Sequence, residues 1–172
     1  MWSTAKYGSA LLYNGVNSYV SLSSTLDIAT VPFTIATWVN PTNYNNYRKI
    51  FSKRGTWTAN AVRVDLTLST GNGHVVFKQP NRILDFNYSP PLNTWTHLAV
   101  VARTTGTDLY VNGALSQTLG AFTLGTGATA PVRIGLAGDG QDPFLGGIDN
   151  LRIYNRALSQ PEVQTDMNTP TK

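Results

Sequence analysis

Apolar and polar residues alternate along most of this chain, in short runs separated by glycine, asparagine, proline and serine. A repeat of two places successive side chains on opposite faces, so each run predicts a β-strand with one buried face. Long helical repeats between the runs are missing, which argues against a parallel sheet with helical crossovers. About a dozen short strands with frequent turns indicate a sandwich or a barrel. Strands are expected at residues 9–13, 19–23, 33–40, 49–54, 62–69, 74–78, 82–87, 94–103, 108–111, 114–119, 132–136 and 147–154.

Local signals predict two hairpins and one helix. Asn112-Gly113 supplies the positive φ values of a tight hairpin turn, and the Gly-Asn-Gly at 71–73 plays the same part between two other strands. Ser159, with Pro161 in the first turn and Glu162 three residues after the cap, has the pattern of a helix N-terminus. Residues 169–172 resemble the start of a linker, so residues 1–172 are predicted to form one domain.

Composition narrows the class of protein. The 172 residues include no cysteine, which excludes disulfides, thiolate metal sites and a cysteine nucleophile. Only 13% of residues are charged, and a surface rich in Thr, Asn and Ser is common on extracellular β domains, so we expect a secreted protein. The lysines and arginines are scattered, which does not favour nucleic acid, and no apolar run is long enough for membrane insertion. The net charge of +4 keeps an acidic polysaccharide among the possible ligands.

Four blocks in order resemble the laminin-G-like jelly-roll domains of the concanavalin-A-like superfamily, over essentially the whole chain. The resemblance implies an all-β fold, a two-sheet antiparallel jelly-roll sandwich, here with one short C-terminal helix. It leaves function open, since sugar-binding modules, adhesion domains and spacers share this fold. The blocks are YGSALLYNGVNSYV at 7–20, FTIATWVNP at 33–41, NTWTHLAVV at 93–101 followed by LYVNG at 109–113, and GIDNLRIYNRALS at 147–159.

Polar side chains recur on one face of several expected strands. Residues 62–68 alternate Val and Leu with Arg, Asp and Thr, and the next two strands repeat this alternation. If these strands are neighbours, their polar residues form one surface suited to sugar hydroxyls, while an ordinary solvated sheet face is the alternative. The residues of this predicted surface are Lys53, Arg63, Asp65, His74, Lys78, Asp85 and Asn87.

Two loops add further candidates for ligand binding. Trp57 lies in a polar loop, where an exposed indole could stack on a sugar ring or could anchor the loop. Asp139 and Asp142 lie in a glycine-rich loop, where they could bind sugar hydroxyls or a cation, or simply face solvent. Trp38 and Trp95 lie inside apolar strand blocks and are expected in the core.

The resemblance also implies a structural Ca²⁺ site. Relatives commonly place a Ca²⁺ ligand at the position of Asp149, with partner oxygens from the turn that contains Asn14, Gly15 and Asn17. The family often has aspartate where this chain has Asn14 and Asn17, which lowers the charge of the site. The alternative is that Asp149 accepts backbone hydrogen bonds and ties the terminal strands together.

Catalytic patterns are sparse, and the chain is predicted not to be an enzyme. Glycosidases need paired carboxylates, but the sole glutamate, Glu162, falls on the predicted helix, and no expected strand carries an alternating acid pair. The leading hypothesis is a carbohydrate-binding module, joined to other domains of a secreted protein, that binds polysaccharide or glycan. A structural or adhesion domain that binds protein is the second hypothesis, and a polysaccharide hydrolase or lyase the third.

Overall fold

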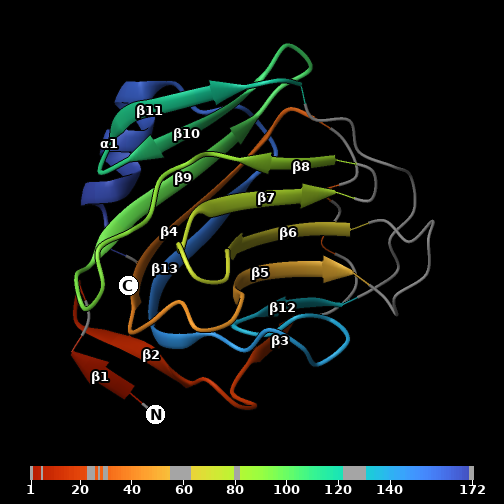
Figure 1. Ribbon diagram of the computed structural model, residues 1–172. Helices are drawn as coiled ribbons and strands as arrows, with labels where there is room; N and C mark the ends of the chain where they lie inside the picture. Colours follow the sequence, from red (N-terminus) through yellow and green to blue (C-terminus); the bar gives the residue numbers. More distant parts are fainter. Residues whose placement is uncertain are drawn as a thin grey trace.

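The computed structural model describes residues 2–4, 6–22, 26, 28, 31–54, 63–79, 82–121 and 131–170, with the backbone alone at 2–4, 63 and 79. In this part of the chain the strands form two antiparallel sheets, of seven and six strands. Figure 1 shows strands β5–β8 lying across β4, β9 and β13, with α1 beside β10 and β11. The expected sandwich with one short C-terminal helix is therefore confirmed.

The seven-stranded sheet contains the first and the last strand of the chain. Its order is β1 (Trp2–Thr4), β2 (Ser9–Asn14), β13 (Leu145–Tyr154), β4 (Phe33–Pro41), β9 (Thr96–Ala102), β10 (Thr107–Val111) and β11 (Ala114–Leu119). The six-stranded sheet has the order β3 (Val20–Leu22), β12 (Val132–Ile134), β5 (Arg48–Arg54), β6 (Arg63–Leu68), β7 (Val75–Gln79) and β8 (Arg82–Asp85). The short strand β1 is the one that the alternation did not predict.

The main core lies between the two sheets. The alternating apolar residues of β6 and β7 point inward and are fully buried, and the rings of Phe33 and Phe77 meet across the sheets with centroids 6.0 Å apart. Each such side chain contributes about 1.5–3 kcal/mol through the apolar surface that it removes from water. Of the two expected core tryptophans, Trp38 is buried, and Trp95 is half-buried against Gly147.

Two predicted local structures are present as expected. Asn112 and Gly113 have φ values of 48° and 78°, so the tight turn between β10 and β11 uses the left-handed conformation that these two residues tolerate. Helix α1 (Gln160–Asn168) has Ser159 as its N-cap, and the backbone N–H of Ser159 donates to Glu162 Oε2 at 2.7 Å. In the described part of the chain, no helix is long and apolar enough to cross a bilayer.

Helix α1 covers the outer side of the seven-stranded sheet. Val163 and Leu158 pack on Ala36, Ala99 and Val101, forming a second, smaller apolar cluster. Strand β4 is consequently buried on both faces, because Ile35 and Val39 point into the main core while Ala36 points toward α1. A strand covered on both sides can carry apolar residues on both faces, as β4 does with Ile35 and Ala36.

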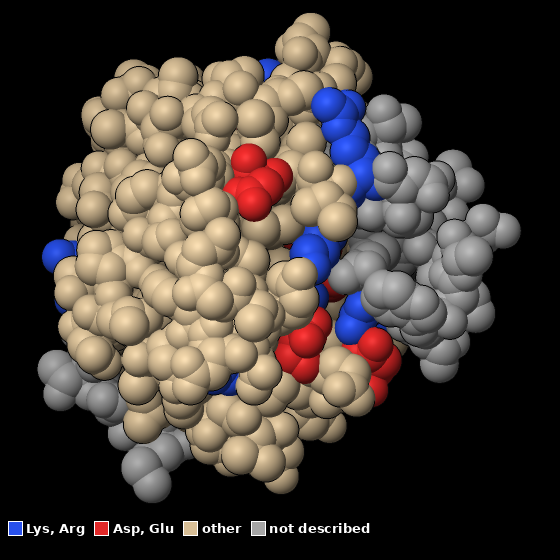
Figure 2. Space-filling view, viewed as in Figure 1, with Lys and Arg blue, Asp and Glu red and all other residues tan. Residues whose placement is uncertain are grey.

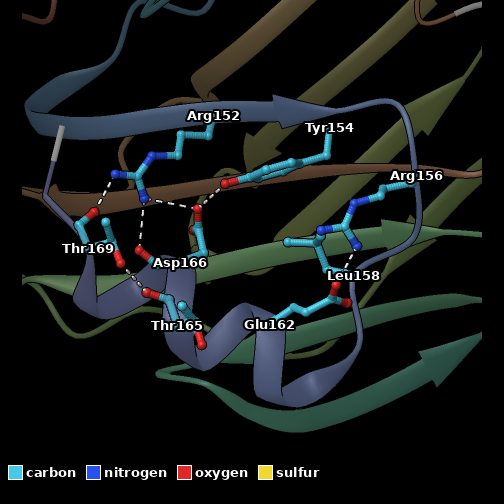
Figure 3. A pocket seen from close by; sticks show the side chains of 8 residues that line it. All are labelled: Arg152, Tyr154, Arg156, Leu158, Glu162, Thr165, Asp166 and Thr169. Carbon is cyan, nitrogen blue, oxygen red and sulfur yellow. Dashed lines mark hydrogen bonds and ion pairs between the residues drawn. The ribbon is translucent and has the colours of Figure 1, made fainter.

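One carboxylate fastens α1 to the sheet. Asp166 lies 2.9 Å from Arg152 Nη1 and 3.4 Å from His97 Nε2, and it accepts a hydrogen bond of 2.5 Å from the Tyr154 hydroxyl. Figure 3 shows Arg152 and Tyr154 of β13 pointing toward Asp166 on the helix. Burial acts to raise the pKa of Asp166, but the hydrogen bonds from His97, Tyr154 and Arg152 together outweigh it and lower the pKa. Asp166 therefore stabilises the fold as an anion.

Replacing this anion should loosen α1. We expect Asp166→Asn to reduce the free energy of unfolding by about 2 kcal/mol, and Tm by roughly 4–8 °C, because the three partners lose a charged acceptor. A group whose pKa is lowered by folding stabilises the native state above its unfolded pKa. The difference from wild type should therefore be full at neutral pH and shrink below about pH 4. Thermal melts from pH 2.5 to 7 measure it, with the exposed Thr165→Ala as the matched helix control. A difference that does not change with pH would contradict this role.

Candidate functional site

The six-stranded sheet has one face toward the core and one face away from it, which we call the outer face. Val64, Leu66 and Leu68 of β6 point inward, so Asp65 and Thr67 belong to the outer face. Strand pairing extends this assignment across the sheet, because residues directly opposite each other share a face. One row on the outer face runs through Arg133, Ser52, Asp65, Lys78 and Ile83, on β12, β5, β6, β7 and β8.

Charged side chains on the outer face form one network. Lys49 Nζ lies 3.2 Å from Asp65 Oδ2 and 3.4 Å from Asp142 Oδ2, and Arg54 joins the same Asp65 to Asp139. Figure 2 shows basic and acidic side chains following one another in a band over the side of the molecule where β5–β8 lie. The residues that bear opposite charges are thus neighbours in space although they come from three separate segments.

The centre of this network is buried. The side chains of Lys49 and Asp65 are both 0% exposed, and that of Arg54 is almost as enclosed. The sequence predicted Asp65 in a polar binding surface. Its face of the sheet is as predicted, but its burial shows that the expected accessibility is wrong. A buried charge must keep its counter-charge, so Asp65 holds Lys49 and Arg54 in place from beneath the surface.

Lys53 does not belong to the outer face. The register of β5 shifts between Lys49 and Phe51, where an extra residue, Ile50, is accommodated as a bulge. After the bulge, Phe51 and Lys53 pair with the inward-facing Leu66 and Val64. The Lys53 ammonium donates to the backbone oxygen of Leu26 at 2.6 Å and is buried there, so the predicted place of Lys53 on the polar surface is wrong.

The loop between β12 and β13 brings both predicted acidic residues to the outer face. Gly138 lies so close to the Arg54 carbonyl oxygen that an added Cβ would approach it within 2.1 Å, and its N–H donates to Ser52 Oγ. This close approach places Asp139 beside Arg54 and Asp142 beside Lys49. The loop therefore forms one wall of the site above β5.

His74, Asp85 and Asn87 meet at the other side of the site. His74 Nδ1 lies 3.0 Å from Asp85 Oδ1, and the same oxygen accepts the backbone N–H of Asn87 at 2.8 Å. The Asp85 side chain is 49% exposed, so it has room for a further donor. The expected proximity of these three residues is present, in an accessible position.

The sequence missed an aromatic residue on the outer face, next to Lys78. Tyr47 is 38% exposed, and the Lys78 ammonium lies 3.8 Å from its ring centroid. Tyr47 follows Asn43, Asn45 and Asn46 immediately before β5, and a ring in such a polar segment was the signal that could have identified it. Trp57, singled out on that ground, lies outside the described residues, as does the side chain of Arg63, whose backbone pairs with Arg54.

The four predicted calcium ligands do not come together. Asn14 Oδ1 accepts three backbone N–H groups of its own turn, and Asn14 Nδ2 donates to Asn17 Oδ1 at 3.0 Å. Asn14 pairs with Leu145, and Asp149 lies four positions further along β13, which corresponds to about 13 Å. Asp149 instead contacts the backbone N–H of Tyr7 at 3.4 Å. The turn of Asn14, Gly15 and Asn17 therefore does not fit one Ca²⁺ shell with Asp149.

Comparison with known families agrees with the fold. A laminin-G-type family model, described as the concanavalin A-like lectin/glucanases superfamily, matches residues 14–164. The chain belongs to this superfamily. None of the curated proteins matches the chain.

Solved structures of the same fold include carbohydrate-binding domains. Domain 4 of AbnA, an extracellular GH43 arabinanase from Geobacillus stearothermophilus, is 25% identical with a TM-score of 0.78 over 97% of this chain and 80% of its own, and was solved with arabinotriose. The CBM40 of the Ruminococcus gnavus IT-sialidase is 19% identical, with a TM-score of 0.73 over 93% of this chain and 97% of its own. The binding domain of botulinum neurotoxin serotype G is 16% identical, with a TM-score of 0.68 over 97% of this chain and 44% of its own.

The buried and the exposed carboxylates should respond differently to substitution. We expect Asp65→Ala to cost about 3–5 kcal/mol of unfolding free energy, because Lys49 and Arg54 lose a buried counter-charge. Asp85→Ala, the matched exposed change, should cost about 1 kcal/mol or less. Urea unfolding of the two variants measures the contrast. Equal losses would show that Asp65 is not the centre of the network.

Proposed function

We propose that this chain is a non-catalytic carbohydrate-binding module of a secreted multi-domain protein, and that it binds polysaccharide or glycan on the outer face around Tyr47. The observation that carries the proposal is the partly exposed Tyr47 ring, which lies against Lys78 of β7. Asp142 lies beside Lys49 of β5 and Asp85 belongs to β8, so carboxylates lie on both sides of β7 in the order of the sheet. An aromatic ring with carboxylates on both sides combines the two kinds of contact that sugars offer.

A sugar ring has a C–H face and a rim of hydroxyls. The C–H face can stack on Tyr47, whose apolar ring area is already partly open to solvent. The hydroxyls can donate to Asp85 and Asp142, whose carboxylates have free acceptor capacity, and Asn87 adds an amide that can donate and accept. Such a site is shallow, so we expect modest affinity per module and stronger retention when modules or sugar units repeat.

The similar structures support a pendant module in a secreted protein. AbnA is an extracellular enzyme, its domain 4 was solved with arabinotriose, and the Ruminococcus gnavus CBM40 was solved with α2,3-sialyllactose. Both are parts of larger enzymes. By analogy, this chain would hold a partner domain close to its polysaccharide.

The charges around the site also support a binding role. Asp65, Asp139 and Asp142 each contact Lys49 or Arg54. Each of these carboxylates is therefore engaged in an ion pair, whereas a glycosidase needs a carboxyl group that can give a proton to the leaving group. The network therefore suits hydroxyl recognition better than acid catalysis.

Removing the aromatic ring tests the proposal. We expect Tyr47→Ala to weaken retention in affinity electrophoresis on a polysaccharide panel by roughly tenfold, since one stacked ring contributes ~1.5 kcal/mol. Tyr47→Phe keeps the ring and should bind within about twofold of wild type. Tm should be nearly equal in both variants. A wild-type protein that no sugar retains, or an alanine variant that binds normally, would overturn the proposal.

A further inference from the structure

The charges of the outer face are arranged by depth. The cations Lys49, Arg54 and Lys78 are all buried, whereas the carboxylates Asp142 and Asp85 are 26% and 49% exposed. Lys49 and Arg54 contact carboxylates, and Lys78 lies against the Tyr47 ring directly opposite Asp65 on the neighbouring strand. Among the described side chains around Tyr47, Asp142 and Asp85 are therefore more accessible to a ligand than Lys49, Arg54 and Lys78.

Two further cations belong to the outer face, Arg63 and Arg133. The side chain of Arg63, whose backbone pairs with Arg54, lies outside the described residues. Arg133 also faces outward, but its guanidinium donates to the Ala137 carbonyl and lies 4.9 Å from the Tyr19 ring. The net charge of +4 of the whole chain therefore does not give the local charge around Tyr47.

Resting on the proposed function, we infer that the ligand of the outer face is a neutral glycan, and that the carboxylates of Asp85, Asp139 and Asp142 discriminate against sugars that carry carboxylates. An acidic sugar would place its anion beside these groups, and like charges in contact are strongly unfavourable. To reach Lys49 or Arg54, such a ligand would have to displace a carboxylate that already contacts the cation. Hydroxyl groups of a neutral sugar, by contrast, can donate to the same oxygens without any displacement.

The selectivity has a matched pair of probes. Polygalacturonate and its fully methyl-esterified form share one backbone and differ in charge, and neutral arabinan and galactan extend the panel. We expect the protein to bind at least one neutral polymer, with retention that changes less than twofold between low salt and 0.5 M NaCl. Polygalacturonate should be retained no better than its methyl ester.

The substitution Asp142→Asn tests the role of one carboxylate directly. Asp142 has φ 56°, a conformation that asparagine also tolerates, so the change removes a charge without straining the backbone. With one carboxylate fewer beside Lys49, retention on polygalacturonate should rise about fivefold at low salt. Glu162→Gln removes the same charge from α1, on the other sheet, and should leave retention unchanged.

The outcomes separate the two proposals. Retention of polygalacturonate at least tenfold stronger than that of its ester, or an Asp142→Asn variant that binds it no better than wild type, would overturn neutral selectivity while leaving glycan binding intact. A wild-type protein that no polymer retains, acidic or neutral, would overturn the proposed function and this inference with it.

Discussion

The ion pair between Lys49 and Asp65 is the constraint on which the outer face of the six-stranded sheet depends. The two groups lie 3.2 Å apart, and neither side chain is exposed. Leaving either charge unpaired at this depth would be costly, so the surrounding residues must supply the remaining partners. Arg54 and Asp142 meet that need, and the loop that carries Asp142 is consequently held against β5. A stability requirement thereby shapes the wall of the proposed sugar site.

Much of the fold could be predicted from local patterns. Alternation identified β2–β13 within a few residues, because each strand has one face that must be buried. The Asn112-Gly113 turn and the N-cap of α1 could be predicted because their residue types are strongly preferred in these local structures. The short strand β1 could not be predicted, since three residues carry too little periodicity.

The site was harder to predict, for physical reasons that particular residues illustrate. Alternation assigns a face but not a depth, so Asp65 was expected at the surface when it lies beneath it. Lys53 was misplaced because a bulge reverses the faces of all residues that follow, and the doublet Ile50-Phe51 was its one trace in the sequence. Tyr47 was missed because only the folded chain reveals that Lys78 lies on its ring. The predicted proximity of Asp149 to the turn of Asn14, Gly15 and Asn17 was wrong because it depends on the register between β2 and β13, which the sequence does not specify.

The bulge at Ile50 has an evolutionary consequence. In a regular strand, the same residues 51–54 would turn Phe51 and Lys53 outward and bring Arg54 into the interior. Gaining or losing a single codon at this point would therefore exchange the faces of several side chains at once. Separate substitutions that led to the same arrangement would pass through intermediates with partly buried charges. A single insertion or deletion in β5 can thus change which of its side chains lie on the outer face in related sandwiches.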